Sequence, residues 1–382
     1  MACAGPRTAL IVTLFFAFVA PATAAPERGD AAFMSAAEKA VETVEREDGF
    51  SGVILVARGD QVLLRKAAGF ADGERNVRNT PETKFPIASI NKQFTAAAIL
   101  LLAEDGRLSL GDPISKHYPA SPAAWKDITI MHLLTHTSGI EDNYANRPEF
   151  RSDKQLFLSV SYQDLIRFAA GQPLAAEPNT RFRYANTNYV LLSAVIEHAS
   201  GQRYEEFLRS RVLAPLGMND TGFGSLPGNL PKGYRRSPDG KWESGLPINV
   251  SALAGAGALH STVDDLLRGH RSMMSGTLLS PSSRQGIFAD HGHNYGFGWY
   301  FQTKFGRRMF WNAGNLTPAG FASVLDYFPD DDVTAVVLTN NTGLTQSKAT
   351  LAVGDGREVE IGAYAARKLL EQIEQLYFGP TQ

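Results

Sequence analysis

A serine and a lysine three residues apart, Ser89 and Lys92, open an apolar run, 94–103, that predicts a helix. Side chains at this spacing lie on one face of a helix, one turn from each other. A lysine amine that is desolvated enough to be neutral can take the proton of a serine hydroxyl and make the serine a nucleophile. The first N–H groups of the helix have no partner within it and can bind a developing oxyanion. Ser-x-x-Lys also occurs by chance in many helices, so the motif needs partners elsewhere in the chain.

A tyrosine and an asparagine, Tyr184 and Asn186, stand just before a second predicted helix, 189–199. A nearby lysine can lower the pKa of a tyrosine through its positive charge, and the phenol could then relay a proton to a leaving group. The asparagine amide could hold a substrate carbonyl and the lysine at once. Taken alone, the pair is better explained by a buried tyrosine with a satisfied hydroxyl and an asparagine that caps a helix.

A third candidate segment, Asn312-Ala-Gly314-Asn315, lies near the C-terminus. Small residues on a strand let the backbone approach a ligand closely. Taken alone, this segment is better explained by an ordinary strand that turns at Thr317-Pro318.

The elements that must position these residues form two groups. A helix at 31–47 precedes two strands, at 52–57 and 61–67, that a hairpin turn joins. The middle section, 91–247, is predicted to be helix and loop, with helices at 128–136, 161–170, 189–199 and 204–213. Strands return at 295–302, 308–311, 319–326 and 334–340, and a long amphipathic helix at 359–377 follows them.

Strands at both ends of the chain and helices between them predict an α+β fold. We expect an antiparallel sheet that is built from both chain ends and flanked by helices, with an all-helical domain inserted. The sheet domain is predicted at 25–88 and 256–382, and the helical domain at 89–255. The candidate active site then lies at the interface of the two domains.

The composition is that of an ordinary soluble protein, with 20% charged residues and a formal net charge of -2. This balance lacks the excess of positive charge that nucleic acid or an anionic membrane surface attracts. The length of 382 residues allows one large domain or two intimately joined domains.

The N-terminus has the pattern of a secretory signal peptide, 1–24: Arg7, an apolar run at 9–20, and small residues up to Ala24. We predict cleavage after Ala24, with cleavage after Ala25 as an alternative, and a periplasmic or secreted protein without a stable membrane anchor. An uncleaved anchor is the rival interpretation. The single cysteine, Cys3, would leave with the peptide, so the mature chain would have neither disulfides nor a cysteine nucleophile.

In order, Ser89-x-x-Lys92, Tyr184-x-Asn186 and the Gly314 strand resemble the serine β-lactamase and penicillin-binding-protein superfamily. Within it the chain is most similar to the class C β-lactamase-related serine hydrolases, which include esterases, D-amino-acid-specific peptidases of the S12 type and amide hydrolases. The resemblance covers 50–341. It implies a β-lactamase/transpeptidase-like fold and two-step hydrolysis without metal or cofactor.

The resemblance also implies a role for each site residue. Ser89 would be the nucleophile, Lys92 its general base, and Tyr184 a proton relay. Asn186 would bind the substrate and hold Lys92. The backbone N–H groups of Ser89 and Asn315 would form the oxyanion hole.

Two departures from the family pattern concern Asn312 and Asn179. On the substrate-binding strand of Gly314, the family usually has lysine or histidine at position 312, and asparagine cannot carry that charge. A site for a substrate carboxylate, as in penicillin or D-Ala-D-Ala, would lose its cation there unless Arg307 or Arg308 supplied one. At position 179 glycine is common, and a left-handed turn tolerates asparagine.

We therefore expect an exported serine hydrolase that cleaves an ester, amide or peptide bond of a small-molecule or peptide substrate through a Ser89 acyl-enzyme. The alternatives are a class C-type β-lactamase or D,D-carboxypeptidase, and a non-catalytic penicillin-binding-like protein that retained the fold. His132 and His136 are four residues apart and could face a metal together, but no acidic third ligand accompanies them, so we expect no metal.

Overall fold

The structure is a computed structural model that describes residues 28–142, 160–224, 231–236, 241–342, 350–352, 358–360 and 364–379. The predicted signal peptide, 1–24, lies outside these residues, and its cleavage stays a prediction. None of the helices in the described ranges combines the length and the apolar character that crossing a membrane requires.

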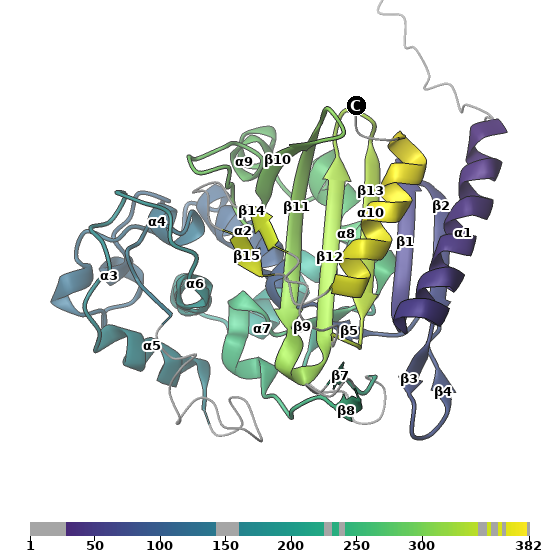
Figure 1. Ribbon diagram of the computed structural model, residues 1–382. Helices are drawn as coiled ribbons and strands as arrows, with labels where there is room; N and C mark the ends of the chain where they lie inside the picture. The colour runs from purple at the N-terminus through teal and green to yellow at the C-terminus, as the bar shows by residue number, and fades with distance from the viewer. Residues whose placement is uncertain are drawn as a thin grey trace, which may run out of the picture.

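Six antiparallel strands form the main sheet in the order β10-β11-β12-β13-β1-β2 (Figure 1). Their bounds are β1 Gly52–Arg58, β2 Gln61–Ala68, β10 Tyr300–Lys304, β11 Arg307–Leu316, β12 Phe321–Phe328 and β13 Val333–Thr339. The two ends of the chain meet where β1 pairs with β13, from Gly52 opposite Thr339 to Arg58 opposite Val333. The predicted fold class, an α+β fold with an antiparallel sheet from both chain ends, is confirmed.

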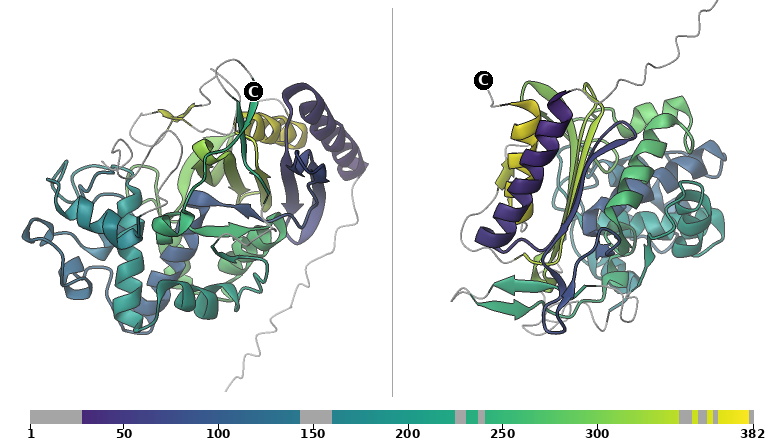
Figure 2. Two further views of the ribbon diagram at one scale, coloured as in Figure 1. Left: turned by 90° about the horizontal axis from the view of Figure 1, so that it is seen from below. Right: turned by 90° about the vertical axis from the view of Figure 1, so that its right-hand side faces the viewer.

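Helices cover both faces of this sheet (Figure 2). The helices α1 (Arg28–Asp48) and α10 (Tyr364–Phe378) pack against each other on one face, and α8 (Val263–Ser275) packs on β1 and β13 from the other. Every residue of β12 and of β13 is buried. Strands enclosed on both faces have near-continuous apolar sequences, as in Val333–Thr339, rather than alternating ones.

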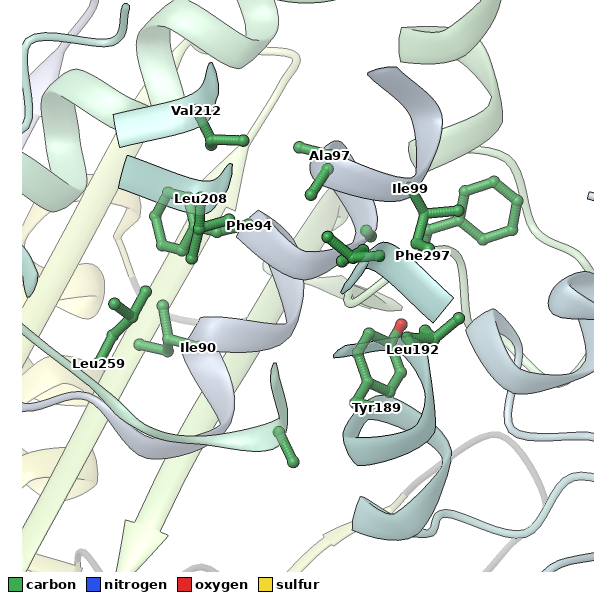
Figure 3. Close-up of a cluster of buried hydrophobic side chains, with 14 of the residues drawn as sticks. Ile90, Phe94, Ala97, Ile99, Tyr189, Leu192, Leu208, Val212, Leu259 and Phe297 are labelled. Carbon is green, nitrogen blue, oxygen red and sulfur yellow. The ribbon is translucent and has the colours of Figure 1, made fainter. Parts of the chain in front are cut away.

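The remaining helices gather beside the sheet, on the left of Figure 1. Their bounds are α2 Asn91–Glu104, α3 Ile114–His117, α4 Ile130–Leu134, α5 Tyr162–Ala170, α6 Asn186–Ser200, α7 Tyr204–Leu208 and, at the sheet edge, α9 Pro281–Ile287. Helix α2 is the central one, because every residue from Asn91 to Leu102 is buried. Figure 3 shows Phe94 and Ile99 of α2 within an apolar cluster that includes Tyr189 and Leu192 of α6. A helix that is apolar all round belongs inside the protein, and α2 carries Lys92 there with it.

Short strands complete the described structure. They are β3 Phe70–Asp72, β4 Val77–Arg78, β5 Phe85–Pro86, β6 Gly222–Phe223, β7 Tyr234–Arg236, β8 Trp242–Ser244, β9 Leu259–Ser261, β14 Thr350–Ala352 and β15 Glu358–Glu360. Three of them, β6, β7 and β8, correct the prediction of helix and loop for 91–247. These strands have two or three residues each, too few to show an alternating pattern in the sequence.

Several predicted boundaries are also wrong. The strand predicted at 308–311 extends to Leu316 as β11, and the helix predicted at 189–199 begins at Asn186 as α6. The strand predicted at 295–302 begins only at Tyr300, because Gly298 adopts a left-handed turn with φ of 82° just before it. The helix predicted at 359–377 begins at Tyr364, and the residues before it include β15. By contrast, Asn179 has φ of 63°, which confirms the expected left-handed turn.

Candidate active site

Ser89 lies in η1, Ala88–Ile90, a single 3-10 turn that leads into α2. The residue before it, Ala88, has φ of 47°, in the left-handed region that costs a residue with a side chain roughly 1–3 kcal/mol. Two glycines make room for this turn. A Cβ on Gly314 would come within 2.9 Å of the Ala88 Cβ, and a Cβ on Gly257 would meet the Ala88 carbonyl carbon at 3.4 Å. The candidate nucleophile therefore follows a strained residue that neighbouring glycines accommodate.

Lys92 is entirely buried and donates hydrogen bonds to three oxygens. The acceptors are Ser89 Oγ at 3.0 Å, Asn186 Oδ1 at 2.9 Å and the Ala256 carbonyl at 2.9 Å. An ammonium group has three N–H donors. All three are used, so the amine is held in one position beside the serine hydroxyl.

Burial also sets the charge of this amine. Loss of water around the ammonium lowers the pKa of Lys92 from 10.5 to about 7, and the negative charge of Asp142 opposes the shift. A large fraction of Lys92 is then neutral near pH 7. A general base works best with a pKa close to the operating pH, so the environment of Lys92 suits it to accept a proton.

The Tyr184 hydroxyl donates to Ser89 Oγ at 2.8 Å, so the serine oxygen lies between Tyr184 and Lys92. The phenol ring packs against His136 and Tyr300, with ring centroids 4.4 and 6.4 Å away. Its burial raises the pKa of Tyr184 above the ordinary value for tyrosine. The expected lowering by Lys92 is therefore wrong, because desolvation of the phenolate dominates. Tyr184 is protonated at neutral pH and can donate to Ser89, but it is not a base in this state.

Asn186 is the first residue of α6, and its side-chain oxygen is one of the acceptors for Lys92. The structure thus brings together all four residues of the first two motifs, although 94 residues separate Lys92 from Asn186. Their catalytic roles stay predictions. The contacts establish a connected chain of hydrogen bonds from Tyr184 through Ser89 and Lys92 to Asn186.

Strand β11 runs past the turn that carries Ser89. Its partner β10 pairs with it only as far as Trp311, so 312–316 has no partner from β10 on that side. A Cβ on Gly314 would come within 2.2 Å of the Ile87 carbonyl oxygen. Only glycine fits where β11 approaches the backbone that carries Ser89.

Asn315 follows at the exposed end of β11, opposite Ala322 of β12. Its side-chain oxygen accepts from the Thr317 N–H at 2.8 Å. This contact fixes the turn after β11 without using the backbone N–H of Asn315. That N–H as an oxyanion donor stays a prediction.

Asn312 is placed differently from a residue that grips substrate. Its side chain is only 2% exposed. Its amide donates to the Gly298 carbonyl at 2.6 Å and to the Ser89 carbonyl at 3.4 Å. The amide nitrogen therefore links the turn before β10 to the backbone of the candidate nucleophile.

The two arginines considered as replacement cations are engaged elsewhere. Arg307 pairs with Asp331 at 2.7 Å and Arg308 with Asp330 at 2.6 Å. Both arginines lie at the start of β11, whereas Gly314 lies near its end. The charge missing at position 312 is not supplied by either of them.

Sequence reasoning missed Asp142, whose carboxylate accepts from the backbone N–H groups of Asn186 and Thr187. Its sequence signal becomes readable only once the start of α6 is known. Position 185, the N-cap of α6, is alanine, which cannot accept these bonds. A buried helix start without its own cap requires an acceptor from another segment.

His136, four residues after His132, does not form a metal pair with it among the described residues. It is entirely buried, and its Nδ1 accepts from the Ala185 N–H at 3.2 Å. Burial and the charge of Lys92 hold the pKa of His136 well below its ordinary value, so the imidazole is neutral. His132 instead accepts from the Thr129 N–H within the cap of α4. In the structure His136 supports the Tyr184 segment.

Comparisons with known proteins identify the family and the fold. The sequence profile of the Beta-lactamase family matches residues 37–356. Penicillin-binding protein 4* of Bacillus subtilis (strain 168) is 28% identical over 326 residues, which cover 78% of this chain and 70% of that protein. The putative penicillin-binding protein PbpX of the same organism is 29% identical over 317 residues, 80% of this chain and 76% of that protein.

Solved structures share the fold. A penicillin-binding protein from Bacillus halodurans superposes with a TM-score of 0.71 at 26% identity, covering 87% of this chain and 98% of that one. The D-amino acid amidase from Ochrobactrum anthropi SV3, in complex with L-phenylalanine amide, gives a TM-score of 0.75 at 21% identity. It covers 91% of this chain and 98% of the amidase. At that identity the second likeness concerns the fold alone.

Proposed function

This chain belongs to the Beta-lactamase family and is, in general class, a serine hydrolase; from that premise we propose that it cleaves an ester, amide or peptide bond through an acyl-enzyme on Ser89. One observation carries the proposal: Ser89 Oγ lies 3.0 Å from the buried amine of Lys92 and 2.8 Å from the Tyr184 hydroxyl. A nucleophile within reach of a base and of a second proton-carrying group is the arrangement that acyl transfer needs.

In the proposed reaction, Ser89 Oγ attacks the substrate carbonyl carbon and its proton passes to Lys92 Nζ. The carbonyl electrons move onto oxygen, where the N–H groups of Ser89 and Asn315 donate to the oxyanion. The leaving group then departs with the proton from Lys92, relayed through Tyr184. A water molecule then attacks the acyl carbon, and its proton passes through Tyr184 and Lys92 to Ser89 Oγ. The bond between Oγ and the acyl carbon breaks, which releases the acid. The pKa of Lys92, about 7, supports both directions of transfer.

The preferred substrates are acyl compounds without a carboxylate beside the reacting bond. Support comes from the uncharged side chain at Asn312 and from the pairing of Arg307 and Arg308 with aspartates. A second candidate, a β-lactamase or D,D-carboxypeptidase, draws support from the two relatives named as penicillin-binding proteins. The connected contacts around Ser89 argue against a third, a binding protein without catalysis.

A substrate panel tests this proposal. Initial rates are measured on a p-nitrophenyl ester, a D-amino-acid amide and nitrocefin, with Ser89→Ala as the matched control. We expect turnover of the ester or the amide to exceed that of nitrocefin, and all turnover to vanish in Ser89→Ala. Nitrocefin turnover as fast as ester turnover would support the second candidate. Folded protein that turns over none of the three would support the third.

We also propose export, on the strength of the pattern at 1–24. The mass of the protein recovered from a bacterial host that exports it gives the test. The expected mature chain begins at Ala25, in the periplasm or the medium, and full-length protein in the membrane fraction contradicts this.

A further inference from the structure

A carboxylate from outside α6 caps the start of this helix. Asp142 Oδ2 accepts from the Asn186 N–H at 2.5 Å, and Oδ1 accepts from the Thr187 N–H at 2.9 Å and the Thr187 hydroxyl at 2.8 Å. The N-cap residue itself, Ala185, has no side-chain cap. The backbone groups that position Asn186 thus depend on an acid 44 residues earlier.

The same carboxylate lies where positive charge is concentrated. The N-terminus of a helix carries a partial positive charge, and Lys92 donates to Asn186, the first residue of α6. An ammonium at this end of a helix is disfavoured, both by the helix dipole and by the loss of water. Asp142 opposes both effects, because it is an anion at the helix start and its charge favours protonated Lys92.

Within the ranges that the structure describes, the other titratable groups around Lys92 are uncharged at neutral pH. From the α4–α5 connection comes neutral His136, and from the start of α6 come the rings of Tyr184 and Tyr189, 4.9 and 5.6 Å from Lys92 Nζ. The pKa of each of these tyrosines is raised by burial, so both are protonated. The remaining contact, from η5 (Val250–Ala256), is a backbone carbonyl. Among the described residues, Asp142 is the acid whose charge acts on Lys92.

We propose that Asp142 is a positioning residue that orients Asn186 against Lys92 and supplies the counter-charge for the ammonium formed when Lys92 takes the Ser89 proton. This inference rests on the proposed function, in which the proton moves from Ser89 Oγ to Lys92 Nζ as the bond from Oγ to the acyl carbon forms. Without the counter-charge, the amine would hold the proton less well, and the later transfer to the leaving group would start from a less stable ammonium.

The substitution Asp142→Asn removes the charge and also one of the two accepting oxygens, because the amide nitrogen of asparagine only donates. The rate alone therefore cannot separate the two roles, whereas the pH dependence reports the charge. The readout is kcat/KM for an activated ester as a function of pH, whose acid limb reports the protonation of Lys92 in the free enzyme. Asp142 favours the protonated amine, so its neutralisation should move the midpoint of this limb to lower pH, by about one unit. Asp142→Glu, which keeps the charge, should leave the midpoint close to that of the wild type.

The matched control is Asp164→Asn. Asp164 caps α5 through bonds with the N–H and hydroxyl of Ser161, in an exposed position. The Asp164→Asn variant should lose about as much stability as Asp142→Asn but keep the wild-type midpoint of the acid limb. A lower rate with an unchanged midpoint in Asp142→Asn would show a purely structural cap and overturn the proposal. A wild-type profile in Asp142→Asn would overturn it as well.

Failure of the proposed function can be distinguished from failure of this inference. Nuclear magnetic resonance of protein with nitrogen-labelled lysine follows Lys92 directly, with Lys92→Met to assign its resonance. If no substrate is hydrolysed, the Lys92 titration should still move to lower pH in Asp142→Asn. An unmoved titration contradicts the inference whatever the activity.

Discussion

Ser89 separates two regions of the site that are built in different ways. On the side of α2 and α6, side chains from distant segments meet, and the contacts of Lys92 use all three of its donors in a fully buried position. On the side of β11, the backbone comes close, the residues are small or uncharged, and Asn315 is exposed. The first region has the properties that acyl transfer requires. The second is the surface that we propose faces the substrate.

Substitutions in the two regions should therefore have different effects. A change of side chain near Lys92 removes a partner from a buried polar atom and alters the proton transfers. A change of side chain on β11 should alter substrate preference more than chemistry. There are two exceptions. At Gly314 any Cβ meets the Ile87 carbonyl, and at Asn312 the replacement must still donate to the Gly298 and Ser89 carbonyls.

The largest effect is expected for Lys92→Met, which removes the base and keeps an unbranched chain. We predict a loss of ester hydrolysis on the order of 10⁴-fold or more, measured as kcat/KM near pH 8. The loss of a base acting together with the nucleophile should be about as severe as the loss of the nucleophile itself. If kcat/KM of Lys92→Met stayed within about tenfold of the wild-type value, Lys92 would not be the base.

The same variant has a stability signature that identifies the buried amine. Lys92 binds its proton up to pH 10.5 in the unfolded chain but only to about 7 in the folded protein. The unfolded state therefore binds more protons between these values, and the stability of the wild type rises with pH across this window. The free energy of unfolding is measured in urea at several pH values. From pH 7 to pH 10 it should increase for the wild type relative to Lys92→Met. A constant difference between the two proteins would contradict the lowered pKa.

A smaller loss, about 10²- to 10³-fold in kcat, is expected for Tyr184→Phe, which removes the proton relay but keeps the ring. The matched control is Tyr204→Phe. Tyr204 is also buried, and its hydroxyl contacts Asn91 and Thr95 of α2 away from Ser89. Both variants should lose about 1 kcal/mol of stability, but only Tyr184→Phe should lose activity. Equal activity losses would indicate a general disturbance of α2 rather than a relay.

On the β11 side, the largest effect is expected for Gly314→Ala. The added Cβ would displace β11 from the backbone of the nucleophile, because it would lie 2.2 Å from the Ile87 oxygen. We expect kcat to fall by about 10²-fold, as for the loss of one oxyanion donor. Gly171→Ala is the control, since its nearest neighbour would be at 3.5 Å. Full activity in Gly314→Ala would show that β11 does not contribute to the oxyanion hole.

The smallest effect on chemistry, and the sharpest on selectivity, is expected for Asn312→Lys. Restoring a cation should raise the rate of acylation by penicillin by about tenfold, the effect of about 1.4 kcal/mol, with a smaller change in ester hydrolysis. Thr303→Lys adds the same charge at an exposed position of β10 and serves as the control. If penicillin acylation does not improve over this control, the charge at position 312 does not determine substrate choice.

The sequence was most informative where chemistry depends on local spacing. Spacing predicted that Ser89 and Lys92 share one helix face. The family resemblance implied that Tyr184 and Asn186 join them, and that position 179, where glycine is common, forms a left-handed turn. What depends on packing could not be predicted. The direction of the Tyr184 pKa was wrong because it follows from burial among His136 and other rings, and burial is set by distant segments.

Asp142 and Asn312 both show that the sequence does not reveal the contacts of individual side chains. Asp142 belongs to none of the recognised sequence motifs, and its role as the cap of α6 emerges only from the folded chain. Asn312 was identified as a departure in residue type, but the sequence could not reveal that its amide points to the Gly298 carbonyl. Residue types suggested the chemistry, while the direction of each side chain required the structure.

The central claim is that Ser89 is the nucleophile that the α2 and α6 side activates. The most direct measurement is the intact mass of the protein after reaction with a fluorophosphonate, followed by peptide mapping. We predict one adduct, on Ser89, which is absent from Ser89→Ala. An adduct that persists in Ser89→Ala, or no adduct on folded wild-type protein, would contradict it.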